Sequence, residues 1–513
     1  MRQCPPSRAE YRSLPEMVSI NTVQERPRQS ARSVSSGVSK SIKSLPIPVI
    51  LYLLAVFLPL NFNIGPLAMN GLRVLLLVLI IPLTINLISG KYGRILWTDI
   101  LFFLHMLWAA VALSVNNPSL VVQNIGSTSI EFIGGYVLAR AYIRTIDDAT
   151  ALTRGLIIMV ICSLPFAFYE ALTGQPILLN TLNKIPGFYS LPDVSSEKRW
   201  GLFRTQTMLA HPIHYGIFCT LALSLTYVGL KGILKTSSRL LFTILIMLGI
   251  FFSLSSGAQI AAVLQIGLIF WAWLFRKVGA RWLLLAGLAI AGYILIDLLS
   301  NRTPIQVFTS YLTFSPANAS WRAITYDWGM RNVWGSPIFG IGLNDWVRPD
   351  WMGPASIDNF WLLMAMRYGF PGVILLLLGF MLPIVQIAFR DFGTEGNLWQ
   401  YRRAWVITLA GLAFSLTTVA VWATAYSFVF FLFGSGMWMI TAKSEHIPAS
   451  SPSGRRSTKR SDDANRQDTN AEAWEVGEDS ALPEGPRYTR FPLKEPGSTK
   501  RLAWNRHKSS MNQ

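Results

Sequence analysis

The sequence is poor in cysteine, in histidine and in charged residues. Of its 513 residues, three are cysteine, five are histidine and only 14% are charged, whereas soluble proteins average about 25% charged residues. No cysteine lies in a loop suited to an extracytoplasmic disulfide, and neither a Cys-x-x-Cys nor a Cys/His metal spacing occurs. A G-x-x-x-x-G-K-[ST] motif is also absent. We therefore expect no metal, no ATP site and no other cofactor.

What the chain has instead is a series of long apolar runs. Hydrophobic residues make up 51% of the sequence, and the runs have the ~20 residues that a helix needs to span about 30 Å of hydrocarbon. A soluble helical core would show amphipathic stripes instead. The pattern predicts an all-α polytopic integral membrane protein with about 12 transmembrane helices, at 46–64, 70–89, 98–115, 128–143, 152–173, 211–230, 239–254, 257–275, 281–299, 358–389, 404–418 and 421–440.

The basic residues of the short loops predict the orientation. If the N-terminal tail is cytoplasmic, every even-numbered loop contains Lys or Arg, as the positive-inside rule requires. The short odd-numbered loops, 65–69 and 116–127, contain neither. We therefore expect both termini on the cytoplasmic side. The basic residues of the even-numbered loops are Lys91, Arg94, Arg140, Arg144, Lys231, Lys235, Arg239, Arg276, Lys277, Arg281, Arg390, Arg402 and Arg403.

The two ends of the chain differ in composition from the domain at 46–442. Residues 1–45 are basic and rich in Ser, and residues 443–513 are rich in Ser, Pro, Gly and mixed charges. Both segments are predicted to be disordered cytoplasmic tails, with basic residues that can contact membrane lipids. The first apolar run begins near Leu45, too far along for a signal peptide, so we expect it to be retained. The net charge of +18 is spread over tails and loops without a nucleic-acid-binding motif, which argues against a nucleic-acid partner.

Two long extracytoplasmic loops, at about 174–210 and 301–357, do not follow the charge rule. They contain Lys184, Lys198, Arg199 and Arg204, and then Arg302, Arg322, Arg331 and Arg348. Because the guanidinium fork binds phosphate in a bidentate manner, these arginines indicate an anion site on the outer face. The alternative is an interfacial cluster at headgroup level, with Trp200 in the aromatic belt. The same alternative applies to His211 and His214, which open the following span.

The second long loop also has aromatic and turn signals. Trp321, Trp328 and Trp334 are spaced as on an amphipathic helix that could lie on the membrane surface. The run Gly335-Ser336-Pro337 predicts its end, and Gly340 and Gly342 permit a tight turn.

Asp358 and Asn359 then stand at the outer mouth of a span. Ionisable residues in such positions are usually functional, although Asp358 could also be a helix N-cap.

The order of these motifs resembles the O-antigen ligase and polymerase-type family. It begins with RWGLFRTQTMLAHPIHYG, continues with a Ser-Gly-Ala helix hairpin at SLSSGAQIAAV and Ser320-x-Arg322, and ends with PIFGIG and a polar pair before RYGFPGVILLL. The resemblance covers about residues 195–390. It implies a helical protein of the bacterial inner membrane that transfers glycan from an undecaprenyl-diphosphate carrier to an acceptor on the outer side, without nucleotide or metal. It also implies that Arg322, and less strongly Arg199, engages the diphosphate.

The sequence departs from the family pattern at two positions. The family often has Ser-Arg-Gly in the hairpin, where this chain has Ser256 in place of the arginine, and often has His-Asn where this chain has Asp358-Asn359. The missing histidine favours polymerisation, or exopolysaccharide chain extension, over ligation to a lipid acceptor. A ligase, a transporter or flippase, a transferase using polyprenyl-monophosphate sugars and a non-catalytic scaffold remain alternatives.

The predicted mechanism is direct displacement at the anomeric carbon. Asp358 is the first candidate for the general base and His211 the second, while Arg322 with Arg199 or Arg204 would stabilise the leaving diphosphate. The other predicted substrate-binding residues are Arg331, Arg348, Trp328 and Asn359. The expected partners are the undecaprenyl-diphosphate-linked glycan, an acceptor glycan or lipid, and membrane lipids, with a polysaccharide chain-length regulator as a further candidate.

Overall fold

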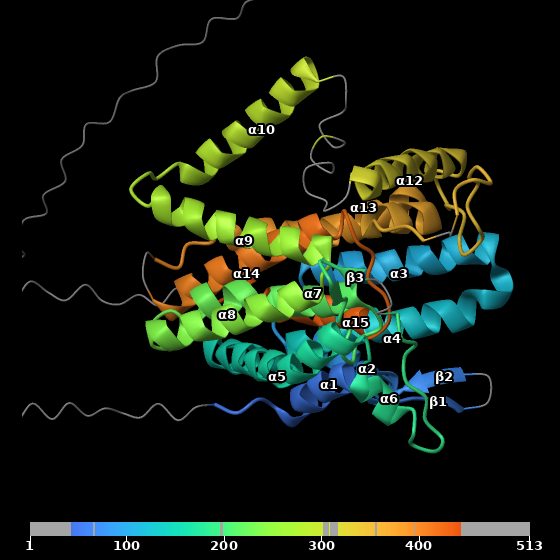
Figure 1. Ribbon diagram of the computed structural model, residues 1–513, viewed down its shortest axis with the longest axis horizontal. Coiled ribbons are helices and arrows are strands. Elements are labelled where there is room, and N and C mark those ends of the chain that lie inside the picture. Colours follow the sequence, from blue (N-terminus) through green and yellow to red (C-terminus); the bar gives the residue numbers. More distant parts are fainter. Residues whose placement is uncertain are drawn as a thin grey trace, which may run out of the picture. The chain divides into compact units, whose positions relative to one another are not determined.

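The computed structural model describes residues 43–64, 67–194, 198–300, 307, 316–353, 356–393 and 396–442 (Figure 1). The chain divides into two compact units, Met1–Ile447 and Pro448–Gln513, and every described residue belongs to the first. Apart from residues 43–45, the predicted tails at 1–45 and 443–513 lie outside the described residues.

The described chain is predominantly helical, and each of the twelve predicted segments overlaps a helix. By length and composition, seven helical segments of the described chain can cross a membrane. The structure therefore confirms an all-α, multi-pass membrane protein, while the number of twelve spans stays a prediction. The helices are α1 (Ile47–Phe57), α2 (Gly71–Ile88), α3 (Trp97–Asn116), α4 (Val121–Tyr142), α5 (Ile146–Thr173), α7 (Pro212–Ser224), α8 (Thr236–Phe252), α9 (Ser256–Leu274), α10 (Arg281–Leu299), α13 (Phe360–Ala388), α14 (Asn397–Ser415) and α15 (Ala423–Gly434).

The predicted first span, 46–64, is too long. Helix α1 ends at Phe57, and Pro59 follows, which cannot donate a backbone hydrogen bond to continue the helix. Strands β1 (Asn61–Ile64) and β2 (Leu67–Asn70) then form an antiparallel hairpin in which Asn61 pairs with Asn70. The stretch that looked like a plain loop between two spans is therefore a β-hairpin.

Two ion pairs explain how charged side chains are accommodated among the helices. Arg73 on α2 contacts Glu131 on α4, with 2.8 Å between Nε and Oε1. Near the other end of α4, Arg140 contacts Asp99 of α3 with 3.0 Å between Nε and Oδ1. Buried charges are tolerated when they are paired in this way, so two charged residues of the predicted fourth span, Glu131 and Arg140, lie in interhelical contacts.

Helix α13 is broken at Gly369, where the backbone has φ 69° and ψ −176°. The break frees two carbonyl groups, which accept hydrogen bonds from the segment before it in the sequence. The N–H of Ile341 donates to Met366 O over 2.7 Å, and that of Gly342 donates to Arg367 O over 3.1 Å. A Cβ atom at Gly369 would lie 2.1 Å from Ile338 O. The PIFGIG segment thus docks against the break and satisfies its backbone.

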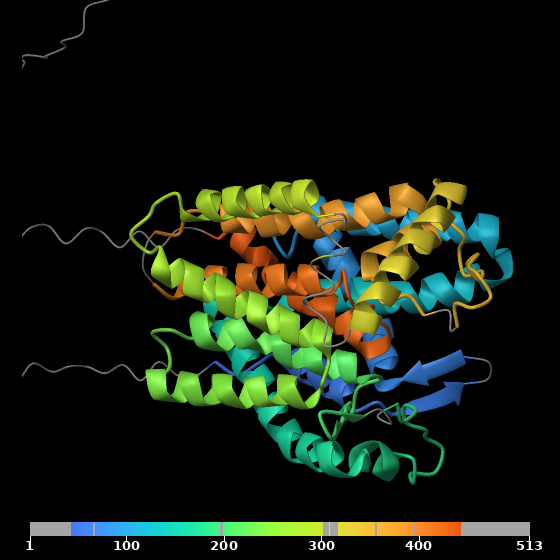
Figure 2. The same ribbon diagram turned by 45° about the horizontal axis from the view of Figure 1, so that its top comes forward.

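The predicted amphipathic helix is α12 (Pro316–Gly335). It packs against the first part of α13 (Figures 1 and 2). The Leu362 side chain of α13 packs against the α12 backbone at Gly329, where a Cβ atom would lie 2.7 Å from Leu362 Cδ2. Trp321 and Trp334 are 39% and 67% exposed. The helix is therefore confirmed, while its location on a membrane surface stays a prediction.

Short elements complete the described chain. They are the 3₁₀ turns η1 (Pro118–Leu120) and η3 (Met437–Ile440), helix α6 (Ile177–Leu182), strands β3 (Lys198–Arg199) and β4 (Leu202–Phe203), and a π-helical turn, η2 (Leu225–Gly229), that continues α7. Of these, the β3–β4 hairpin matters most for the site, because it carries Arg199.

Candidate functional site

The turn between α8 and α9 is the centre of the candidate site. Three residues, Ser253, Leu254 and Ser255, join the two helices, and Leu254 adopts a left-handed backbone with φ 44°. The Ser253 hydroxyl donates to Ile250 O over 2.7 Å and accepts from the N–H of Ser255 over 3.3 Å. These bonds hold the turn so that the Leu254 carbonyl and the Ser256 hydroxyl face other elements.

Two arginines from the long loops reach this turn. Arg199 on β3 donates through Nη1 to the carbonyl oxygen of Leu254 over 2.9 Å. Arg322 on α12 donates through Nη2 to the hydroxyl of Ser256 over 3.5 Å. The tight β3–β4 hairpin is closed by Trp200 and Gly201, both with positive φ. Segments far apart in the sequence therefore bring two guanidinium groups to one short turn.

The charge of Asp358 interacts with that of Arg322. Burial lowers the pKa of the Arg322 guanidinium; Asp358 opposes this shift and Arg199 adds to it. The buried Nη1 atom of Arg322 has no hydrogen-bond partner within the part of the chain that the structure describes. A partly desolvated cation beside a second cation is stabilised by an anion that can accept from it. The structure thus brings together three of the predicted site residues: Arg199, Arg322 and Asp358.

The side chain of Asp358 does not cap helix α13. The N-cap is Asn359, whose Oδ1 accepts from the N–H of Leu362 over 3.0 Å. The alternative interpretation of Asp358 as the N-cap is therefore wrong, and its side chain is exposed. Asn359, predicted to bind substrate, uses its side-chain oxygen in the cap.

The loop between α14 and α15 joins the starts of α13 and α9. The N–H of Phe360 contacts both Leu416 O and Val419 O, at 2.9 and 3.1 Å. A Cβ atom on Gly257, the second residue of α9, would lie only 2.5 Å from Val419 Cγ1. One loop therefore fixes the helix start next to Asp358 relative to the turn that both arginines contact.

A second group at this end consists of His211, His214 and Trp422. His211 is the N-cap of α7, and its Nδ1 accepts from the N–H of Ile213 over 3.1 Å. The Trp422 ring centroid lies 5.6 Å from that of His211 and 4.1 Å from that of His214. Trp422 is 43% exposed. Sequence reasoning missed it because it stands in an apolar run with no polar neighbour to draw attention to it.

Glu170 is the other residue that sequence reasoning missed. It lies near the end of α5, is 1% exposed, and accepts from the N–H groups of Gln206 and Thr207 over 2.8 and 2.9 Å. These bonds hold the loop that contains Arg204, which is 8% exposed. A carboxylate in an apolar run near a helix end was the available signal. Its role in the structure is to hold the backbone of the first long loop.

Strained backbone is concentrated in these loops. Among the described residues, the non-glycine residues with positive φ are Trp200, Thr207, Leu254 and Ala423. They lie, respectively, in the β3–β4 hairpin, in the loop held by Glu170, in the α8–α9 turn and next to Trp422. Such conformations are costly for residues with a Cβ atom, and they cluster at functional sites.

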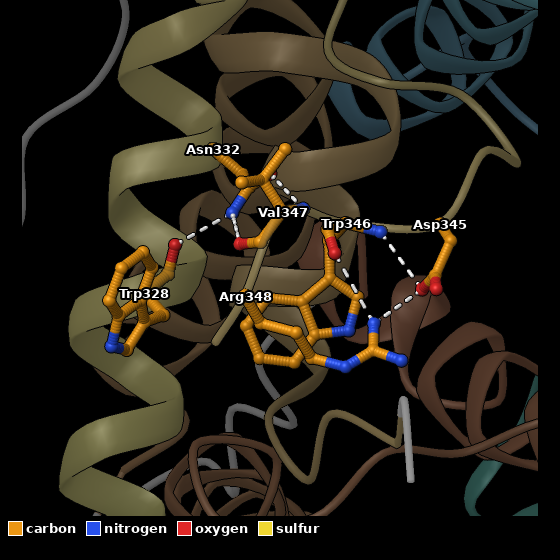
Figure 3. Close-up of polar contacts among 6 residues, drawn as sticks. All are labelled: Trp328, Asn332, Asp345, Trp346, Val347 and Arg348. Atoms are coloured by element: carbon orange, nitrogen blue, oxygen red, sulfur yellow. Dashed lines mark hydrogen bonds and ion pairs between the residues drawn. The ribbon is translucent and has the colours of Figure 1, made fainter. Parts of the chain in front are cut away.

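The remaining predicted substrate-binding residues belong to a separate set of contacts (Figure 3). The Asn332 side chain joins α12 to the following loop, since it accepts from the N–H of Val347 and donates to Val347 O, both over 2.8 Å. Arg348 contacts Asp345 over 2.5 Å, and its guanidinium lies 5.3 Å from the Trp346 ring.

Arg331 lies 4.5 Å from the Trp328 ring. Nine residues of helix separate Arg331 from Arg322, which places the two on opposite faces of α12 and about 14 Å apart along its axis. The structure therefore does not bring Arg331, Arg348 and Trp328 into the group around Arg322.

Fold and site together define a multi-pass helical membrane protein with a polar, arginine-containing site at one end of its helices. No group of three or more His, Cys, Asp or Glu side chains that could hold a metal ion occurs among the described residues. Residues 241–377 match the family model described as O-antigen ligase, which confirms the predicted resemblance over this segment. The match includes Ser256, Arg322 and Asp358, but it begins after Arg199. No curated protein matches the chain.

Proposed function

We propose that this protein transfers or polymerises undecaprenyl-diphosphate-linked glycan repeat units on the outer side of the bacterial inner membrane. The observation that supports this proposal is the meeting of Arg322, Arg199 and Asp358 at the α8–α9 turn. The family match over the same segment implies involvement in surface polysaccharide assembly. A chain-length regulator of the polysaccharide is a candidate partner.

In this proposal the donor diphosphate binds beside Arg322. Its Nη1 atom has no acceptor within the described chain, and phosphate oxygens accept guanidinium N–H groups with good geometry. Arg199 adds a second positive charge from the opposite long loop. As the bond from the anomeric carbon to the diphosphate oxygen breaks, negative charge grows on the leaving group, and both arginines stabilise it.

Asp358 is the proposed general base. The acceptor hydroxyl forms the new bond to the anomeric carbon, its proton moves to the Asp358 carboxylate, and undecaprenyl diphosphate leaves. Asp358 is exposed and is not used as a helix cap, so it can meet an acceptor. His211 is the second candidate, and its Nδ1 accepts the cap hydrogen bond from Ile213. The exposed Trp422 ring beside it offers a flat apolar face for a sugar.

Between the two family activities, we favour polymerisation. The support is that an aspartate, Asp358, stands where the ligases of the family often have histidine. Ligation to a lipid acceptor would use the same donor site and differ only in the acceptor.

Complementation of a deletion strain tests the proposal. The gene is deleted and restored as wild type, Arg322→Ala or Asp358→Ala at matched membrane levels, and the surface glycan is sized on a gel. Polymerase activity predicts that deletion shortens chains to single repeat units and that neither variant restores length. Long polymer that persists without its lipid acceptor would indicate a ligase instead. Unchanged glycan in the deletion strain would count against the proposal and favour transport.

A further inference from the structure

The other end of the helices carries a second basic region. Helix α14 runs antiparallel to α9, because Ser415 at its end donates to Gly257 O near the start of α9 over 3.3 Å. Figure 1 shows α9, α13 and α14 alongside one another. Since 19 residues of helix extend about 28 Å, the start of α14 and the end of α13 lie a membrane thickness away from the α8–α9 turn. This is the predicted cytoplasmic face.

A cavity of about 490 Å³ opens at this end. Arg94 and Arg390 line it from the segments before α3 and after α13, together with Gln386. Its other lining includes Ile95 and Trp97, which are 47% and 70% exposed. The lining therefore combines guanidinium and amide donors with exposed apolar and aromatic side chains.

Arg390 is held in place but has hydrogen-bonding capacity to spare. Its Nη2 atom donates to Ala442 O over 2.6 Å, which fixes the guanidinium. Its buried Nε atom has no hydrogen-bond partner within the described residues. A buried donor without an acceptor costs about 1–3 kcal/mol, and a ligand oxygen would remove that cost.

More positive charge adjoins the cavity. Arg402 donates through Nη1 to the Arg390 carbonyl oxygen. Burial lowers the pKa of the Arg403 guanidinium to about 10, and the charges of Arg281 and Arg402 add to that shift. The guanidinium groups are all cations, so they repel one another. Asp391 is the acidic group that acts on Arg402 in the opposite direction, and it does not balance the arginines.

We propose that this cavity binds the headgroup of an anionic phospholipid of the inner leaflet. The phosphate would accept from Arg390 and Arg94, and the glycerol and upper acyl chains would lie on Trp97 and Ile95. Tryptophan is favoured at the level of lipid headgroups, and the cytoplasmic leaflet attracts basic side chains. The apolar wall favours a lipid over free phosphate, which would leave that wall exposed to water. This site is separate from the proposed glycan site and does not depend on it.

Lipid binding to the purified full-length protein tests this inference. Thermal unfolding and native mass spectrometry are recorded with phosphatidylglycerol, with phosphatidylcholine and with inorganic phosphate. The variants are Arg390→Gln and Arg94→Gln, and the matched control is Arg276→Gln, which removes one charge after the end of α9 and outside the cavity. We expect phosphatidylglycerol to raise the unfolding temperature of the wild type more than phosphatidylcholine does. Each cavity variant should bind phosphatidylglycerol roughly fivefold more weakly than the wild type, which is the effect of one arginine near an anionic leaflet. The control should bind it as the wild type does.

Three results would overturn the inference. Equal binding by wild type and both cavity variants would show that the cavity is not the site. An equal loss in Arg276→Gln would show that only total charge matters. The same stabilisation by inorganic phosphate would indicate a site for a free anion. If Arg390→Gln fails to fold because its bond to Ala442 is lost, Arg94→Gln decides the question, since Arg94 is exposed and its side chain can be replaced at little cost.

Discussion

Arg322 donates to the hydroxyl of Ser256 over 3.5 Å, and this contact joins α12 to the first residue of α9. The family that this segment matches often has an arginine at the position of Ser256. In this chain the Ser256 hydroxyl accepts a hydrogen bond from the guanidinium of Arg322, which lies on a different helix. Arg199 donates to the carbonyl oxygen of Leu254 in the same turn. Positive charge therefore reaches the turn from both long loops instead of from the turn itself.

Arg322→Ala tests the role of this arginine in the reaction. Loss of a donor aimed at developing charge typically costs ~10²–10³ in rate, so we expect turnover of a lipid-linked donor to fall by about that factor. Arg322→Lys should recover only part of it, because an ammonium group lacks the guanidinium fork. Arg331→Ala, on the opposite face of α12, is the control and should retain most activity. Comparable losses in both variants would indicate a structural role for the helix instead.

Asp358→Asn and His211→Asn separate the two candidate bases. Loss of a general base lowers the rate by ~10²–10⁴. We expect this loss for Asp358→Asn and a much smaller effect for His211→Asn, in which asparagine can still cap α7. Initial rates in membranes with matched protein levels provide the measurement. The reverse order of effects would assign the base to His211.

Glu170→Gln tests how the first long loop is held. The amide can replace only one of the two carboxylate acceptors, so either Gln206 or Thr207 is left with a buried, unpaired N–H. We expect the free energy of unfolding to fall by about 1–3 kcal/mol, measured by denaturant unfolding in detergent. Asp350→Asn in the second long loop is the control, because its side chain is exposed. An unchanged unfolding midpoint for Glu170→Gln would contradict this account.

Gly369→Ala tests the break in α13. Alanine is strained at φ 69°, and its Cβ atom would lie 2.1 Å from the Ile338 carbonyl oxygen. We expect destabilisation of about 1–3 kcal/mol or failure to accumulate in the membrane. Gly267→Ala on α9 has open space around the new methyl group and should be neutral or slightly stabilising. Quantitative immunoblotting of membranes and thermal unfolding compare the two variants.

The sequence predicted the helices well because apolar runs report directly on what a bilayer requires. It predicted Arg322 and Arg199 as candidate site residues because positive charge on the predicted outer face breaks the positive-inside pattern, and Asp358 because an ionisable residue stands at the mouth of a span. It predicted that Arg322 acts with Arg199 or Arg204, but it did not separate Arg331 from this group. Arg331 and Arg322 look alike in sequence, and only the packing of α12 through Gly329 determines the face that each occupies.

Other features depend on tertiary contacts that no local pattern encodes. Trp422 joins the histidines only because the loop before α15 folds over α7. The Glu170 carboxylate accepts hydrogen bonds from backbone N–H groups more than thirty residues further along the chain. The β1–β2 hairpin was hidden because its strands are apolar enough to look like the end of a membrane span.

The break at Gly369 divides α13 into two parts with different surroundings. The first part is held by α12 and by the PIFGIG segment. The second packs against α3, where a Cβ atom on Gly379 would lie 2.7 Å from Phe102 Cδ1, and has exposed apolar side chains such as Val385. A helix adapts to bilayers of different thickness mainly by tilting, and a break lets the second part change its tilt together with α3 while the first part keeps its contacts with α12. Asp358 would then keep its position beside Arg322 in thin and thick membranes alike, so that catalytic geometry is insulated from lipid composition.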